Sequence, residues 1–150
     1  MEDCIFCKII KGEIPAAKVY EDEWVFAFLD LSQATPGHTL VIPKDHRQDI
    51  FDYEDDLAAE VFRRVPRIAK AIKEAFPEAQ GMNIAMNNGP LAYQSVFHSH
   101  IHLLPRYSEE DGFAMTFTNN QDKYSQAEFK QRAEKIGQAI KLKEDGDEEI

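Results

Sequence analysis

The sequence predicts an α+β fold in which five strands form a mostly antiparallel sheet with helices on one side. Five short runs are rich in β-branched and aromatic residues, and turn residues separate them. In residues 55–76, apolar side chains recur every three or four positions, as in an amphipathic helix that lies on a sheet. Short connections between successive strands favour antiparallel pairing.

Length and composition are those of one globular domain, which we place at residues 3–142, followed by an acidic, disordered tail at 143–150. The chain has 150 residues, of which 43% are hydrophobic, enough to bury a core. A net charge of −10 repels polyanions, so we expect no nucleic-acid partner.

Neither a membrane span nor a signal peptide is expected. No apolar run approaches the roughly 18–20 residues of a transmembrane helix, and residues 1–4 lack a basic start and an apolar stretch. We therefore expect a cytoplasmic protein with no membrane partner.

The first half of the chain predicts one short helix and three strands. Residues 4–11 have a short helical pattern that ends at Gly12. Strands are expected at 18–20 and 24–29, across a tight acidic turn, and at 38–42.

The second half predicts two helices and two strands. Pro66 lies inside the helical pattern of residues 55–76 and is expected to kink that helix or split it in two. A fourth strand follows at 82–86, and the fifth carries three histidines. A capping box, Ser-Gln-Ala-Glu at 125–128, begins the last helix.

Three of the five histidines, His98, His100 and His102, stand at alternate positions. Alternation is the period of a strand, so we expect them on one face, with neighbours roughly 6.5–7 Å apart. A polar outer face of a half-exposed strand is the plain alternative. A functional cluster is the better interpretation, because buried imidazoles need hydrogen-bond partners.

Alternating histidines serve two kinds of chemistry. They can bind a metal, or one imidazole can attack phosphorus while its neighbours hydrogen-bond the phosphoryl oxygens. Amides, a hydroxyl and flexible backbone at residues 87–90 and 94–95 favour the second, because they can stabilise an anion. No cluster of carboxylates accompanies the histidines, which weakens the case for a di-metal hydrolase.

The only two cysteines, Cys4 and Cys7, form a Cys-x-x-Cys motif that allows three interpretations. They can be a redox pair, two buried thiols, or half of a tetrahedral zinc site. The zinc site needs two further ligands, which His46 and the histidine cluster could supply.

Four segments together resemble the histidine-triad (HIT) superfamily, and the resemblance covers about residues 4–107. They are residues 4–10 (CIFCKII), 28–30 (FLD), 36–44 (PGHTLVIPK) and 94–104 (QSVFHSHIHLL). The chain is most similar to the bacterial zinc-bearing branch of the histidine-triad nucleotide-binding proteins. The resemblance implies a five-stranded antiparallel sheet and a homodimer. It also implies hydrolysis or transfer at the α-phosphate of purine nucleotide conjugates.

The resemblance also implies roles for individual residues. His100 is the nucleophile that forms a nucleotidyl-histidine intermediate, His102 hydrogen-bonds the phosphoryl oxygens, and His38 lies beside the nucleophile on the adjacent strand. The positions that contact phosphate and leaving group are Gln94, Ser95 and Asn87. The positions that hold the nucleoside are Asp30, at the ribose, and Phe6, Ile9, Phe28 and Leu31, around the base.

We expect one structural zinc per chain, bound by Cys4, Cys7, His46 and His98 and not required for the chemistry. Two thiolates and two imidazoles complete a tetrahedral site. His98 then has to turn away from the face that it would share with His100.

The leaving group stays open, as do two other functions. Residues 105–111 (PRYSEED) differ from the glycine-rich, tryptophan-bearing ending of eukaryotic phosphoramidases. Phosphoramidates, acyl-adenylates and dinucleoside polyphosphates therefore all remain candidate substrates. The alternatives are a nucleotide-binding or scaffold protein with little turnover, and a metalloenzyme that uses the histidines as ligands.

Overall fold

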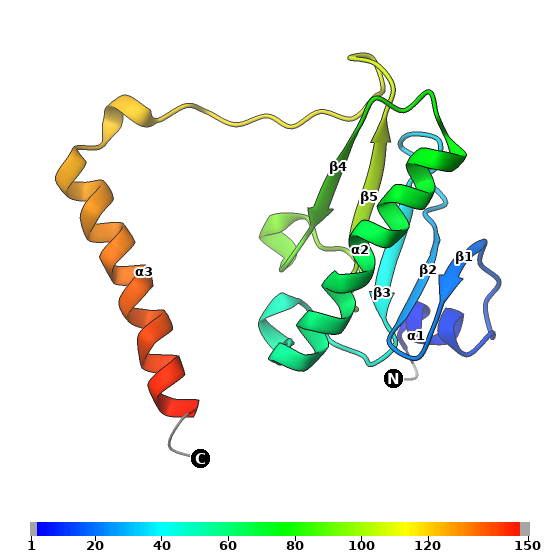
Figure 1. Ribbon diagram of the computed structural model, residues 1–150, viewed down its shortest axis with the longest axis horizontal. Helices are drawn as coiled ribbons and strands as arrows, with labels where there is room; N and C mark the ends of the chain where they lie inside the picture. Colours follow the sequence, from blue (N-terminus) through cyan, green and yellow to red (C-terminus); the bar gives the residue numbers. More distant parts are fainter. Residues whose placement is uncertain (1–2, 148–150) are drawn as a thin grey trace. The chain divides into compact units, whose positions relative to one another are not determined.

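The computed structural model describes residues 3–147, with side chains to residue 143 (Figure 1). Contacts divide the described chain into two compact units, one that ends at Ala114 and one that begins at Met115. The first unit contains the sheet and its two helices, and the second contains one long helix.

The first unit is built on a five-stranded sheet in the order β1-β2-β3-β5-β4, and every neighbouring pair is antiparallel. The strands are β1 (Lys18–Glu21), β2 (Val25–Leu29), β3 (Thr39–Pro43), β4 (Gly81–Met86) and β5 (Ile101–Arg106). The predicted α+β class and its antiparallel sheet are confirmed. The strand that carries His102 lies inside the sheet, between β3 and β4.

Helix α2 (Asp55–Ala75) covers one face of the sheet, and its apolar stripe forms the main core (Figure 1). The buried residues of this core are Leu57, Val61, Val65, Ile68 and Ile72 from the helix and Val25, Ala27, Val41, Ile101 and Leu103 from the strands. The helix continues through Pro66, so of the two predicted outcomes, a kink or a split, the split does not occur. Apolar side chains before and after the proline pack on the same sheet and keep the two halves together.

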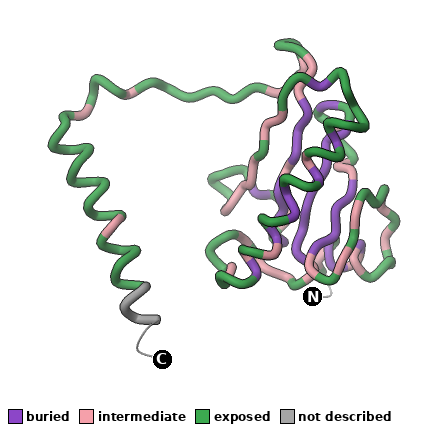
Figure 2. Tube along the Cα trace, in the orientation of Figure 1, coloured by how far each residue is buried: buried purple, intermediate pink, exposed green. Residues whose placement is uncertain are grey.

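Helix α1 (Ile5–Ile10) packs on the opposite face, so the helices are not confined to one side as the sequence predicted. Successive residues of a strand point to opposite faces. In β2, Val25 and Ala27 face α2, whereas Phe26 and Phe28 face α1. Both faces of the central strands are therefore buried (Figure 2).

The histidine-rich segment is only partly a strand. β5 begins at Ile101, and the residues before it, including His98 and His100, lie in a loop. The expectation of three histidines on one strand face is therefore wrong. The strand does not begin earlier because the Ser99 backbone N–H donates to the Arg47 carbonyl, 2.7 Å away, in the loop after β3.

The second unit contains α3 (Gln126–Asp147). Its predicted capping box is present, because Glu128 N donates to Ser125 Oγ and Ser125 N donates to Glu128 Oε1, both at 3.2 Å. The predicted boundary at residue 142 falls inside this helix, and the last part of the predicted tail, 148–150, lies outside the described residues. Among the described helices, none is long and apolar enough to cross a membrane.

An ion-pair network joins α2 to the turn between β1 and β2. Arg64 donates from Nε to Asp22 Oδ2 and from a terminal nitrogen to Glu60 Oε2, 2.7 Å away. Asp22 Oδ1 also accepts from the backbone N–H groups of Trp24 (2.8 Å) and Val25 (3.0 Å). Burial alone would raise the pKa of Asp22, but these hydrogen bonds, led by that from Arg64, hold it well below its usual range.

We predict that Asp22→Asn lowers the free energy of unfolding by about 1–3 kcal/mol at pH 7, because Arg64 loses its charged partner. A depressed carboxyl pKa stabilises the fold above its unfolded value of about 3.9, and this contribution is lost as pH falls. The difference between variant and wild type should therefore shrink between pH 5 and pH 2. Urea unfolding measures it, with Glu23→Gln, an exposed carboxylate of the same turn, as control. An equal loss in both variants would contradict the prediction.

Candidate functional site

Three histidines from two paired strands meet on the face of the sheet that also carries α1. His38 directly precedes β3, His100 directly precedes β5, and His102 lies within β5. Because β3 and β5 pair with Leu40 opposite His102, the rings come together. The His102 ring centroid lies 5.2 Å from that of His38 and 5.1 Å from that of His100.

Backbone groups set the proton positions on these rings. His100 Nδ1 lies 2.8 Å from the His98 carbonyl oxygen, which can only accept, so Nδ1 carries the proton and Nε2 keeps its lone pair. His38 Nδ1 accepts from the Ala34 backbone N–H at 3.3 Å, so its proton is on Nε2, 2.9 Å from His102 Nδ1. His102 consequently presents Nε2–H as a donor.

All three imidazoles favour their neutral forms. Burial lowers the pKa of His100, and burial together with the neighbouring His100 and His38 lowers that of His102 to about 4. The pKa of His38 is lowered by burial, with the nearby Asp30 carboxylate acting in the opposite sense. The cluster thus combines an unprotonated nitrogen with a neutral hydrogen-bond donor, as attack on phosphorus requires.

An apolar cavity of about 250 Å³ lies next to the cluster, between α1 and the face of β2 opposite α2. All five residues that the sequence assigned to the nucleoside line it: Phe6, Ile9, Phe28, Asp30 and Leu31. The Phe6 ring contacts the His100 ring edge-on, with centroids 5.2 Å apart. The cavity therefore opens beside the candidate nucleophile.

Sequence reasoning missed the other residues that line this cavity. They are Ile5, Ile14, Pro15, Ala16, Leu29, Leu40 and Val96. Small and aliphatic side chains of this kind look like core residues in a sequence, so no local signal could have identified them.

Among the residues that the structure describes, Asp30 is the only charged one that lines the cavity. Burial raises the pKa of its carboxyl, but hydrogen bonds from the Ser32 hydroxyl and backbone N–H outweigh this and lower it, so the group is ionised. Its Oδ2 lies 3.6 Å from His38 Nε2. A carboxylate between an apolar cavity and the histidines can accept hydrogen bonds from a pair of hydroxyl groups.

The three residues expected at the phosphate occupy different environments. Gln94 is buried, and its amide accepts from Gly89 N (2.8 Å) and donates to the Gln48 carbonyl (2.6 Å). Asn87 Nδ2 donates to the carbonyl of a nearby loop residue at 3.5 Å, and Ser95 is exposed. The Gln94 side chain thus links the loops that contain Gly89 and Gln48 through hydrogen bonds.

The four predicted metal ligands form one compact cluster. Cys4 Sγ lies 3.3 Å from His98 Nδ1, and Cys7 Sγ lies 3.4 Å from His46 Nδ1 and 3.5 Å from His98 Nδ1. The two imidazole nitrogens are 3.2 Å apart, and all four ligand atoms lie within 4.8 Å of one another. His98 does turn away from His100, because it lies in the loop and not in β5.

The geometry of this cluster suits a tetrahedral ion. Zinc bonds of about 2.3 Å to sulfur and 2.0–2.1 Å to nitrogen separate the ligand atoms of a tetrahedron by roughly 3.3–3.8 Å. His98 Nε2 donates to the Pro43 carbonyl at 2.8 Å, which leaves the Nδ1 lone pair for the metal. Both cysteines are free thiols. The residues present can therefore hold a metal ion.

A second group with ligand atoms this close, Asp30, His38 and His102, is less suitable. His38 accepts a backbone hydrogen bond at Nδ1 and so carries its proton on Nε2, the atom that would have to bind the ion. Among the described residues, the thiol-containing cluster is thus the better metal site.

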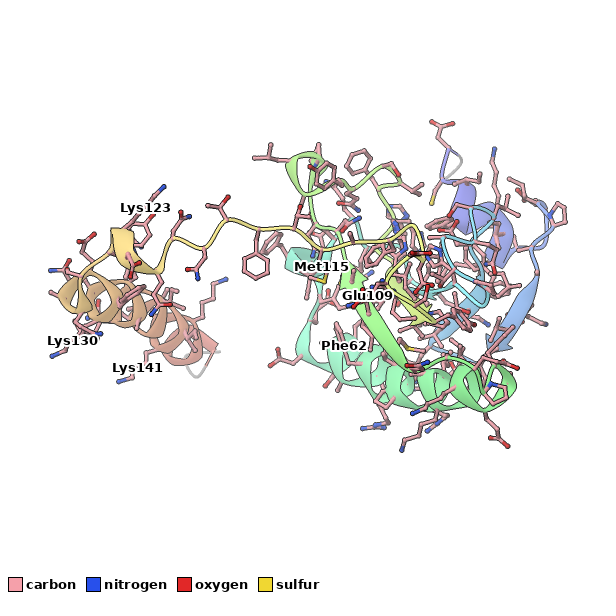
Figure 3. The ribbon with its side chains drawn as sticks, turned by 90° about the horizontal axis from the view of Figure 1, so that it is seen from above. Phe62, Glu109, Met115, Lys123, Lys130 and Lys141 are labelled. Atoms are coloured by element: carbon pink, nitrogen blue, oxygen red, sulfur yellow. The ribbon has the colours of Figure 1, made fainter. Side chains whose placement is uncertain are left out.

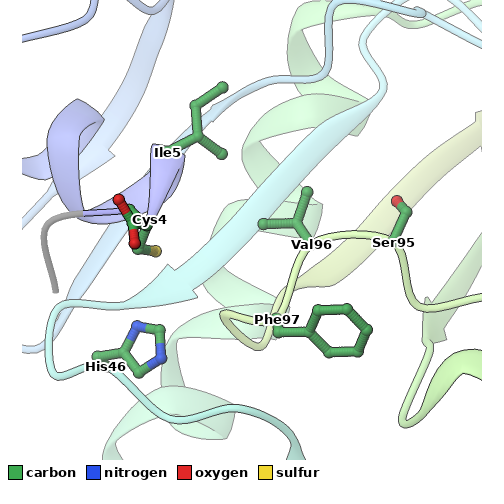
Figure 4. A pocket seen from close by; sticks show the side chains of 7 residues that line it. Cys4, Ile5, His46, Ser95, Val96 and Phe97 are labelled. Carbon is green, nitrogen blue, oxygen red and sulfur yellow. The ribbon is translucent and has the colours of Figure 1, made fainter.

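A separate cavity of about 320 Å³ adjoins the cluster of Cys4, Cys7, His46 and His98 (Figure 4). Cys4, at the start of α1, and His46, in the loop after β3, lie on one side of it, and Ser95–Phe97 lie on the other. Ser95 therefore lines this cavity and does not line the apolar cavity beside His100.

Comparisons with known proteins agree with this geometry. The HIT domain family matches residues 11–109. A crystal structure of a HIT family protein from Bacillus anthracis is similar with a TM-score of 0.88 and 51% identity, covering 92% of this chain and 97% of that one.

Two further relatives are named for different properties, one for its activity and one for a bound metal. An adenosine 5'-monophosphoramidase of Schizosaccharomyces pombe is 38% identical over 138 residues, which is 92% of this chain and 98% of the relative. A zinc-bound histidine triad family protein from Mycobacterium smegmatis has a TM-score of 0.70 and 39% identity, covering 81% of this chain and 87% of that one. By sequence, fold and the arrangement of its histidines, the chain belongs to the HIT family.

Proposed function

We propose that the protein is a nucleotide hydrolase or transferase that acts at the α-phosphate of purine nucleotide conjugates through a nucleotidyl-histidine intermediate. The observation that carries this proposal is the unprotonated Nε2 of His100, held beside an apolar cavity that has one carboxylate. The activity named for the yeast relative supports it, because a phosphoramidase breaks a bond at that phosphorus.

Two displacements at one phosphorus account for the reaction. His100 Nε2 attacks the α-phosphorus, the bond to the leaving group breaks, and the leaving group departs with a proton from solvent, which the attacking water gives back in the second step. Water then attacks the same phosphorus, the phosphorus–nitrogen bond breaks, and the nucleoside monophosphate leaves while His100 is regenerated. The His98 carbonyl, on Nδ1–H, stabilises the positive charge on the phosphorylated ring.

The neighbouring residues would bind and orient the nucleotide. His102 Nε2–H donates to a phosphoryl oxygen where charge increases in the transition state. Asp30 accepts from the ribose hydroxyls, and the apolar cavity holds the base between Phe6, Phe28 and aliphatic side chains. Asp30 apart, no described side chain that lines this cavity offers a polar group to a base, so we expect base selection by shape. Asn87 and Ser95 would contact the phosphate or leaving group, and Gln94 would hold their loops.

We predict that His100→Ala lowers turnover by about 10³-fold or more, on the order of 4 kcal/mol in activation free energy, because the attacking atom is lost. His102→Ala should cost less, on the order of 10²-fold, because it removes one oxygen contact. His38→Ala should cost no more than His102→Ala.

Single-turnover release of adenosine monophosphate from an adenosine phosphoramidate, with trapping of the labelled protein adduct, measures these effects. More than about a tenth of the wild-type rate in His100→Ala, or an adduct at another residue, would overturn the assignment. Nucleotide binding by the wild type without turnover would favour the alternative of a binding or scaffold protein.

We also propose that the metal of the Cys4, Cys7, His46 and His98 cluster is one structural zinc per chain. Such an ion would tie α1 to the loops after β3 and before β5, and so hold the nucleoside cavity against the catalytic histidines. Two thiolates favour zinc over harder cations. A site of this kind also fits a reducing compartment, in line with a cytoplasmic protein.

Elemental analysis of protein purified without added metal should give about one zinc per chain. Cys7→Ser should lose the ion, whereas His102→Ala, which changes a histidine outside the cluster, should retain it. Chelation should lower the unfolding temperature. The His100 adduct should still form after chelation, because the zinc takes no part in the chemistry. Zinc near zero in the wild type, with unchanged stability after chelation, would refute the proposal.

We also propose that the protein forms a homodimer. Strand β4 is an edge of the sheet, and Ile84 on it and Phe62 on α2 are 54% and 40% exposed. Edge strands with apolar side chains favour pairing with a second chain. Two copies joined along this surface would cover both the edge and the apolar side chains.

Light scattering at micromolar concentration should therefore give a mass near twice 17.2 kDa. Ile84→Lys should shift the mass toward that of one chain by placing a charge in the interface. Val19→Lys, at a 42% exposed position on the opposite edge strand β1, is the matched control and should leave the dimer intact. A wild-type mass of one chain would exclude the dimer.

A further inference from the structure

One peptide unit, between His98 and Ser99, joins the metal cluster to the candidate nucleophile. Its carbonyl accepts from His100 Nδ1 at 2.8 Å, and its N–H donates to the Arg47 carbonyl at 2.7 Å. Both groups belong to one rigid plane, so any rotation of this unit breaks both hydrogen bonds together. The orientation of the His100 ring thus depends on how firmly this peptide is held.

The Ser99 side chain also restrains this peptide unit. Ser99 is fully buried, and its hydroxyl lies 2.8 Å from the phenol oxygen of Tyr53. Tyr53 comes from a distant part of the chain, between a short helix at Ile50–Asp52 and α2. It packs against the main core, and its ring lies 6.4 Å from that of Phe62. The core thus holds the Tyr53 ring in place, and the contact with its phenol oxygen fixes the Ser99 hydroxyl.

We propose that Tyr53 is a positioning residue for the nucleophile. By fixing the Ser99 hydroxyl, the phenol restricts rotation about the Ser99 N–Cα bond, and the His98 carbonyl then stays aligned with His100 Nδ1. The ring keeps its proton on Nδ1 and its Nε2 lone pair directed at the phosphorus. This inference rests on the proposed function, although the orientation of the ring can be measured without any turnover.

A hydroxyl pair in a core can also serve stability alone, and the experiment has to separate the two roles. Tyr53→Phe removes the phenol oxygen and keeps the ring in the core. Ser99→Ala removes the other hydroxyl. Tyr20→Phe is the matched control, because it removes a phenol that donates to Asp22 at 2.7 Å, in the β1–β2 turn.

In single-turnover assays with an adenosine phosphoramidate, Tyr53→Phe and Ser99→Ala should each lower the rate constant about three- to tenfold, with the nucleotide dissociation constant unchanged. The double variant should be no slower than the slower single variant, because both substitutions remove one interaction. Zinc content should equal that of the wild type, and Tyr20→Phe should react at the wild-type rate.

Nitrogen-15 NMR of the histidine side chains gives the readout that a purely structural role would not change. The wild type should show His100 protonated at Nδ1, and Tyr53→Phe should show an increased share of the Nε2–H form. If the wild type has no turnover, the proposed function fails, and the NMR comparison alone then decides the positioning role. A wild-type rate in Tyr53→Phe, or a His100 tautomer unchanged by it, would overturn the inference.

Discussion

The antiparallel pairing of β3 with β5 is the interaction on which the rest of the site depends. It places Leu40 opposite His102 and so brings His38, at the start of one strand, against a ring on the other. Ile101 and Leu103 point from the same strand into the core beneath α2, which fixes the strand in this register. A shift by one residue would exchange the faces of the strand, placing His102 in the main core and Leu103 on the face of the histidine cluster.

The loop before β5 explains how neighbouring histidines acquire different tasks. In a regular strand, His98 and His100 would point the same way. Outside the strand, the chain can turn the His98 ring toward the cysteines and the His100 ring toward the cavity. The backbone carbonyl of His98 meanwhile orients the His100 ring. One short segment therefore serves both the metal cluster and the candidate active site.

The exposure of apolar side chains distinguishes the two units of the chain. The first unit buries most of its apolar side chains in two clusters, on opposite faces of the sheet. In α3 the apolar residues Phe129, Ile136 and Ile140 remain 43–65% exposed, and cations such as Lys130 and Lys141 project from the helix (Figure 3). A sound capping box starts this helix, but capping stabilises one end only and does not bury a face.

Much of this protein could be predicted from the sequence because the patterns are local. The strand runs, the apolar period of α2 and the capping box at Ser125 each depend on residues a few positions apart. The histidine spacing and the Cys4–Cys7 pair likewise identified candidate site residues, although the choice among their possible chemistries came from the family resemblance. The five nucleoside residues that the resemblance supplied all line one cavity.

Only the tertiary structure decided how these groups are oriented. The start of β5 at Ile101, the tautomer of His100 and the hydrogen bond between Tyr53 and Ser99 were all set by the tertiary structure. Sequence spacing cannot show that the Arg47 carbonyl captures the N–H that would otherwise extend the strand. The sequence by itself thus determined which side chains are available. The tertiary structure determined which nitrogen carries a proton, because that depends on hydrogen bonds between segments far apart in the chain.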